Sequence, residues 1–163
     1  DLLQSLSEVD PQRIGVIGHS LGGHNSLFVG VFDQRLKVVV TSCGWTPFHD
    51  YYGGKIAGWT SDRYMPRLRT AYDLKPDRVP FDFYEVVAAI APRALFSNSP
   101  TRDSNFDVAG VRKAEQKARP VFALLSSAEQ LQVRYPDSAH DFPPEVRQEA
   151  YALIDRVLGR AEK

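Results

Sequence analysis

One short segment of the chain has the residue types and spacing of a covalent nucleophile. Gly18-His19-Ser20-Leu21-Gly22 places a serine between two glycines, with an apolar run before it and a helical pattern after it. This is the context that a functional Gly-x-Ser-x-Gly pattern requires. The serine projects above the sheet from such a turn, and residues without side chains fit where strand and helix approach each other. We expect Ser20 to attack an acyl carbon, with the backbone N–H of Leu21 stabilising the oxyanion.

A serine hydroxyl needs a positioned base, and the chain offers four histidines. His19 and His24 flank the serine within the turn and the helix, so neither can face it from a separate loop. His49 comes before the region where an acid is expected. His140 lies in a loop between the last predicted strand and the last predicted helix. Because enzymes with this serine motif have the chain order serine, acid, histidine, we predict that His140 is the base.

The acid that orients this histidine should follow the strand predicted at 94–97. Asp103 and Asp107 both lie in the segment after that strand. Asp103 comes within a few residues of the strand end, and we predict that it is the acid. Asp107 is the alternative acid, but it directly precedes a predicted helix, where aspartate commonly caps the helix N-terminus.

The elements that must position these residues alternate between strands and helices. Strands are predicted at 13–17, 36–41, 94–97 and 131–135. Helices are predicted at 1–9, 21–31, 84–90, 108–117 and from Pro144 onward. Apolar strands that alternate with helices are typical of a mostly parallel sheet with helices on both faces. Because an average sheet has about five or six strands, we expect residues 1–163 to form one partial catalytic domain whose N-terminal strands are missing.

The composition excludes several classes of function. Of the 163 residues 43% are hydrophobic, and Lys+Arg and Asp+Glu both number 20. This balance gives no reason to expect nucleic acid or an anionic membrane as a partner. No stretch approaches the roughly 18 apolar residues of a membrane span. Cys43 is the single cysteine, so an internal disulfide is excluded. The sequence predicts neither a location nor an oligomeric state.

The segments around the predicted triad resemble the α/β-hydrolase superfamily. Beyond the serine motif, the resemblance rests on three stretches, at 91–95, 102–107 and 135–142. They resemble bacterial esterases grouped with acetyl xylan esterases, dienelactone-hydrolase-like proteins and prolyl-oligopeptidase-like hydrolases. The resemblance implies the C-terminal half of an α/β-hydrolase fold, with Ser20, Asp103 and His140 as nucleophile, acid and base. It also implies chemistry that uses no metal and no other cofactor.

Two departures from these relatives affect the expected activity. Dienelactone hydrolases proper have a cysteine in the serine position, so Ser20 argues against that reaction. The relatives also carry several strands before the serine motif, and a loop after an early strand supplies a second oxyanion amide. The loss of one oxyanion donor typically lowers the rate by about 10²- to 10³-fold. The activity of the chain on its own is therefore left open.

An aromatic-rich segment at about 44–80 separates the second and third predicted strands. Both tryptophans fall in this segment, together with several of the tyrosines. Insertions at the top of such a sheet build lids and pocket walls, and aromatic rings suit sugars. We expect a substrate-binding surface here, formed by Trp45, His49, Tyr51 and Trp59. In the alternative interpretation, these side chains pack the segment onto the body of the protein or cover an interface.

Together these features predict a serine hydrolase that cleaves carboxylic esters through an acyl-enzyme intermediate. The candidate substrate is a small-molecule or carbohydrate ester, with acetylated carbohydrate in first place. A serine peptidase of the prolyl oligopeptidase type is one alternative, since the same triad cleaves amides. The other alternative is a non-catalytic fragment that keeps the fold without turnover.

Overall fold

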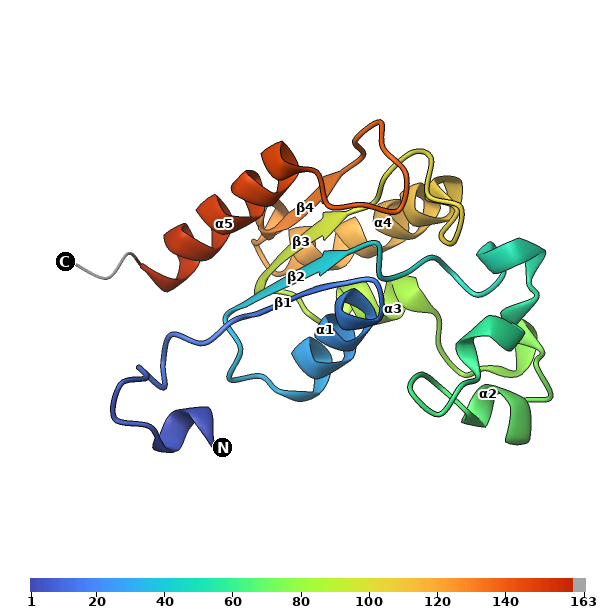
Figure 1. Cartoon of the computed structure of the whole chain (residues 1–163), viewed down its shortest axis with the longest axis horizontal. Helices are drawn as coiled ribbons and strands as arrows, with labels where there is room; N and C mark the ends of the chain where they lie inside the picture. Colours follow the sequence, from blue (N-terminus) through green and yellow to red (C-terminus); the bar gives the residue numbers. More distant parts are fainter. Residues whose placement is uncertain (160–163) are drawn as a thin grey trace.

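A computed structural model of the chain describes residues 1–159, which form one four-stranded parallel sheet flanked by helices. The strands are β1 (Val16–His19), β2 (Val38–Ser42), β3 (Ala94–Asn98) and β4 (Leu131–Arg134). Each strand pairs in parallel with the next, so the order in the sheet equals the order in the sequence (Figure 1). Every residue of β2 and β3 is buried. The predicted α/β fold with a mostly parallel sheet is confirmed.

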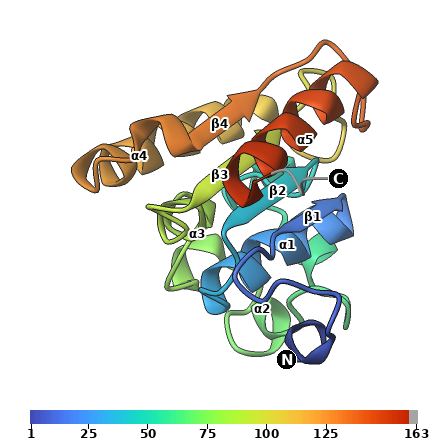
Figure 2. The same cartoon turned by 90° about the vertical axis from the view of Figure 1, so that its left-hand side faces the viewer.

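Helices cover both faces of this sheet because the two central strands are apolar on both faces. On one face, Val39 and Leu95 belong to a large core with residues of α1 (Leu21–Phe32), α3 (Phe83–Ala88) and α4 (Val108–Leu124). On the other face, Val38, Val40 and Phe96 pack against α5 (Pro144–Leu158) (Figure 2). The segment that contains His140 therefore connects β4 to the helix on the opposite face of the sheet from α1.

The aromatic-rich segment follows β2 and forms a separate lobe of short helices on the α1 side of the sheet (Figure 1). It contains α2 (Arg67–Thr70) and the 3-10 helices η2 (Tyr51–Gly53), η3 (Ile56–Trp59) and η4 (Pro76–Arg78). Two further 3-10 helices, η1 (Leu3–Ser5) and η5 (Ala128–Gln130), lie outside this lobe. In the part of the chain that the structure describes, no helix is long and apolar enough for a membrane span.

Three predicted boundaries are wrong by three residues or more, and the burial of side chains accounts for the first and the third. The helix expected at 1–9 is a single turn, because its leucines are exposed and find no surface to stabilise a short helix. The first strand begins at Val16 instead of residue 13. Helix α4 continues through Pro120 to Leu124, well beyond residue 117. The buried residues Ala118 and Phe122 extend its apolar stripe, and this packing outweighs the cost of an interior proline.

Candidate active site

Ser20 lies on the sharp turn between β1 and α1. Its φ of 55° is in the left-handed region, which is uncommon for a residue with a side chain and is typical of functional turns. A Cβ atom at Gly18 would lie 2.1 Å from the carbonyl oxygen of Gly22, and one at Gly23 would lie 2.7 Å from that of Ser42. A Cβ atom at Gly22 would meet nothing within 4 Å. The close packing of β1 against α1 therefore requires glycine at positions 18 and 23. The expectation that Gly22 is also needed for lack of space is wrong.

The side chains of Ser20, His140 and Asp103 form a continuous hydrogen-bonded row. His140 Nε2 lies 2.9 Å from Ser20 Oγ, and His140 Nδ1 lies 2.9 Å and 3.0 Å from the two carboxylate oxygens of Asp103. A carboxylate accepts hydrogen bonds, so the proton of the neutral imidazole belongs on Nδ1. Nε2 is then free to accept the hydroxyl proton of Ser20. This is the arrangement that a serine nucleophile and its general base require.

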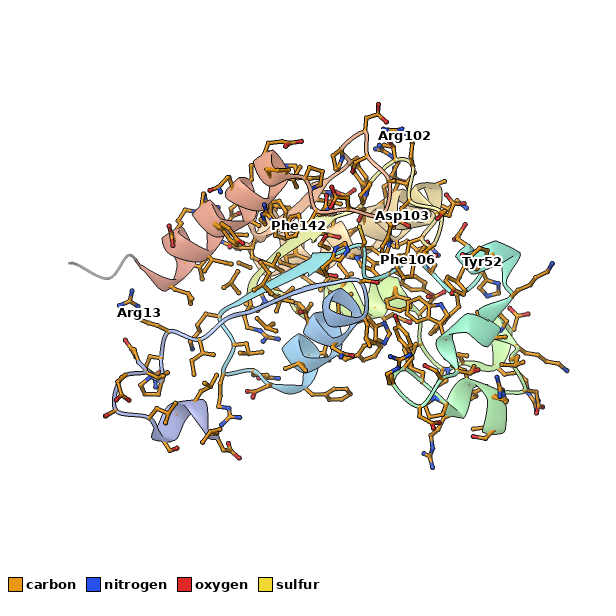
Figure 3. The ribbon with its side chains drawn as sticks, viewed as in Figure 1. Arg13, Tyr52, Arg102, Asp103, Phe106 and Phe142 are labelled. Carbon is orange, nitrogen blue, oxygen red and sulfur yellow. The ribbon has the colours of Figure 1, made fainter. Side chains whose placement is uncertain are left out.

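The loop after β3 holds Asp103 in place. Its side chain is 1% exposed, and one carboxylate oxygen accepts the backbone N–H groups of Asn105 at 2.8 Å and Phe106 at 3.3 Å. Figure 3 labels Asp103 and Phe106 in this part of the molecule. Asp107, the alternative acid, instead caps α4 by accepting the N–H of Ala109. The structure thus brings Asp103, and not Asp107, to His140.

Two rings flank the imidazole of His140. The ring centroid of Phe106 lies 5.9 Å from it, and that of His19 lies 5.1 Å from it. Burial lowers the pKa of His19, and the neighbouring His140 lowers it further, which favours the neutral form of the ring. Its Nδ1 lies 3.0 Å from Ser42 Oγ, so this ring packs beside the predicted base without competing for Ser20. The contact between Phe106 and His140 was not predicted from the sequence. The position of Phe106, three residues after the predicted acid, could have indicated that it lies near the base.

The expected oxyanion donor is the backbone N–H of Leu21. Leu21 is the first residue of α1, so its N–H is one of the four at a helix N-terminus that have no partner within the helix. The helix dipole favours negative charge at this end. The position suits an oxyanion that forms next to Ser20, and the role of Leu21 stays a prediction.

Cys43 lies next to the acid and the base, which raises the question of a metal site. Its sulfur and one ligand atom each of Asp103 and His140 lie within 4.8 Å of one another, and such donors suit zinc. A zinc ligand must be a thiolate. Burial raises the pKa of Cys43 to about 12, with a further contribution from the charge of Asp103. Without a metal, Cys43 therefore keeps its proton. His140 and Asp103 are already hydrogen-bonded to each other and, through His140, to Ser20.

The two tryptophans predicted to bind substrate are core residues. Trp45 is 2% exposed and Trp59 is 1% exposed, and both belong to the main hydrophobic core. The indole N–H of Trp45 donates to Ser97 Oγ at 3.0 Å. Because neither ring reaches the surface, direct contact of Trp45 or Trp59 with a substrate is contradicted. Their packing matches the alternative interpretation, in which the aromatic segment is held to the body of the protein.

The other two predicted binding residues, His49 and Tyr51, have no direct contact with the row of Ser20, His140 and Asp103. His49 faces Asp77 at 3.2 Å and lines a surface cavity of about 730 Å³ whose lining includes none of the three. Tyr51 is partly buried and packs against Phe106, so it touches the surroundings of His140 through that ring. Among residues 1–159, neither His49 nor Tyr51 forms a hydrogen bond, ion pair or ring contact with Ser20, His140 or Asp103.

The comparisons with known proteins agree with this fold. A family model described as "Glucuronyl esterase, fungi" matches residues 1–126. The chain is 26% identical over 138 residues to Carbohydrate esterase MZ0003 from an unknown prokaryotic organism, covering 78% of this chain and 31% of that protein. It is 29% identical over 163 residues to the putative hydrolase YtaP of Bacillus subtilis (strain 168), covering 97% of this chain and 50% of YtaP.

Solved structures show the same fold. A glucuronoyl esterase from Solibacter usitatus superposes with a TM-score of 0.76 at 20% identity, covering 98% of this chain and 46% of that one. A family 15 glucuronoyl esterase from Caldicellulosiruptor kristjansonii gives 0.78 at 21% identity, covering 94% and 45%. The chain spans half or less of the length of these relatives. The matches support a serine esterase fold of the α/β-hydrolase type but do not confirm the finer resemblance to acetyl xylan esterases or prolyl oligopeptidases. On the match to more than three quarters of its length, the chain belongs to the glucuronyl esterase family.

Proposed function

We propose that the protein is a serine-dependent carboxylic ester hydrolase whose substrates are carbohydrate esters of glucuronic acid. Family membership and the hydrogen-bonded row of Ser20, His140 and Asp103 support this proposal. A related glucuronoyl esterase from Sporotrichum thermophile has been solved in complex with methyl 4-O-methyl-β-D-glucopyranuronate. The sugar is then the acyl part of the ester, whereas in the acetylated carbohydrate expected from the sequence it would be the alcohol part.

The proposed reaction proceeds through an ester of Ser20. The hydroxyl of Ser20 attacks the acyl carbon while His140 Nε2 takes its proton, and Asp103 orients and stabilises the resulting imidazolium. The N–H of Leu21 stabilises the oxyanion. His140 then returns the proton to the leaving alcohol oxygen, and the glucuronoyl group stays on Ser20. Water, deprotonated by His140, attacks this ester and releases the glucuronic acid and the free serine.

One observation carries the proposal: His140 joins Ser20 Oγ to the buried carboxylate of Asp103 through hydrogen bonds of 2.9 Å. A fluorophosphonate probe tests it directly, because it labels only a serine that a base activates. We expect the 163-residue chain to be labelled and Ser20→Ala to be unlabelled. Ser26→Ala is the matched control. It removes a serine hydroxyl of α1, the helix that follows Ser20, and this hydroxyl donates to the carbonyl oxygen of Gly22. An unlabelled but folded wild-type chain would contradict the proposal.

Substrate assays then separate the alternatives. We expect hydrolysis of p-nitrophenyl acetate and of methyl glucuronate, with Ser20→Ala inactive on both. Cleavage of a dipeptide anilide at a comparable rate would favour the peptidase alternative. The chain spans half or less of the length of its relatives, which is the observation that favours the non-catalytic alternative. Labelling without turnover of any ester would support that alternative.

A further inference from the structure

A buried amide lies beneath the predicted site and has no part in the triad. Asn98 is the last residue of β3 and is 1% exposed. Its Nδ2 donates to the carbonyl oxygen of Asp141 at 2.8 Å and to the hydroxyl oxygen of Ser42 at 2.9 Å. A carbonyl oxygen can only accept, so the amide nitrogen, and not its oxygen, must face Asp141.

The amide oxygen of Asn98 has no hydrogen-bond partner among residues 1–159. A buried polar atom without a partner costs free energy of folding, and such atoms call for an explanation. Both N–H groups of the amide are used, and each reaches a residue next to the catalytic row. The arrangement therefore points to a role in holding that row together.

Asp141 directly follows His140, so its carbonyl is the anchor on one side of the predicted base. Besides Asn98, the thiol of Cys43 donates to the same carbonyl at 3.3 Å. On the other side of His140, the carbonyl of Ser138 accepts the backbone N–H of Arg102 at 3.0 Å. The backbone that carries the imidazole is thus held between two anchors, one from the acid loop and one from the end of β3.

Ser42 connects this anchor to the nucleophile. Its backbone carbonyl accepts the N–H of Ser20 at 2.8 Å, while its side chain accepts the N–H of Asn98. One residue of β2 therefore contacts both the nucleophile and the amide that holds the base loop.

We propose that Asn98 is a positioning residue that sets the distance between His140 Nε2 and Ser20 Oγ by joining the Asp141 carbonyl to Ser42. The inference rests on the proposed function and extends it. A displacement of about 1 Å in such a pair can lower the rate about 100-fold. The amide acts on the chemical step and not on substrate binding, because it is buried and does not reach the surface.

Asn98→Asp tests this with little change in shape. The substitution replaces the donor by a carboxylate oxygen that the Asp141 carbonyl repels. We expect kcat for p-nitrophenyl acetate to fall about 10- to 100-fold with KM changed less than about twofold. Ser97→Ala is the matched control, since it removes a fully buried hydroxyl from the same strand that bonds to Trp45. We expect it to change the thermal midpoint and leave kcat within about twofold.

A proton NMR measurement separates this inference from the proposed function. The Nδ1 proton shared between His140 and Asp103 should give a low-field resonance whether or not the chain turns over an ester. We expect Ser97→Ala to keep this resonance and Asn98→Asp to broaden or lose it, with recovery toward acid pH as the introduced carboxyl gains a proton. A wild-type chain that shows the resonance but is not labelled by fluorophosphonate would overturn the proposed function alone.

The positioning role has its own contradicting outcome. If Asn98→Asp is folded and keeps both kcat and the low-field resonance, the inference is wrong. If Asn98→Asp does not fold, Ser42→Ala provides a second test. It removes the hydroxyl that accepts the hydrogen bond from Asn98. We expect it to lower kcat at least about threefold. Wild-type kcat in this variant would equally overturn the inference.

Discussion

The segments that follow β2 and β3 leave the same edge of the sheet but use their side chains differently. After β3, Asp103 reaches His140, and three N–H groups, those of Asn105, Phe106 and His140 Nδ1, donate to its carboxylate. After β2, Trp45 and Trp59 turn inward and pack against Phe83. The first segment supplies the predicted chemistry, and the second supplies packing for the helices beneath it. We therefore expect substitutions after β3 to lower the rate of reaction and substitutions after β2 to lower the stability of the fold.

The largest expected effect concerns the acid loop. Asp103→Asn keeps the shape of the side chain but no longer requires the proton of His140 to be on Nδ1, so Nε2 loses its role as an acceptor. We expect kcat for p-nitrophenyl acetate to fall about 10³- to 10⁴-fold, with little change in the thermal midpoint. Asp107→Asn is the matched control because an asparagine still caps α4. An equal loss in both variants would contradict the assignment of Asp103.

The second expected effect concerns the aromatic segment. Trp45→Ala removes a fully buried ring and leaves a cavity, so we expect the free energy of unfolding to fall by about 3–5 kcal/mol. Trp45→Phe keeps most of the ring and removes the hydrogen bond to Ser97, and its effect should be smaller. Urea unfolding measures both. A Trp45→Ala variant with unchanged stability and an increased KM would instead support the prediction that Trp45 binds substrate.

The third and smallest expected effect is the pH dependence of that packing. His24 is buried among Phe28, Trp59 and Tyr64, and burial lowers its pKa from 6.5 to about 4. The unfolded chain then binds the proton more readily, so stability is full above pH 6.5 and declines as the pH falls toward 4. We expect the free energy of unfolding to decrease by about 2 kcal/mol between pH 7 and pH 5.

His24→Phe isolates this contribution. It replaces the imidazole by a ring that does not titrate, and we expect it to remove most of the decrease between pH 7 and pH 5. Urea unfolding at the two pH values provides the measurement. The same decrease in the variant would show that other groups carry the pH dependence.

The sequence could predict the parts of the site that depend on a short motif or on the order of residues along the chain. The serine motif places Ser20 on a strand-to-helix turn, and chain order selects His140 and the region of Asp103. The inward packing of Trp45 and Trp59 could not be predicted, because an aromatic-rich loop has the same composition whether its rings face a ligand or the core. Asn98 was also missed, since a buried amide is recognised only from the atoms around it. The length of α4 depends on packing against residues distant in the sequence, such as those of α3.

The sulfhydryl of Cys43 has a practical consequence for anyone handling this protein. A thiol that is enclosed and protonated at neutral pH reacts poorly with maleimides, iodoacetamide and mild oxidants. Such reagents should therefore leave the folded protein intact, and reducing agents can be omitted from the buffer. Labelling by a fluorophosphonate can then be measured without a competing reaction at this thiol.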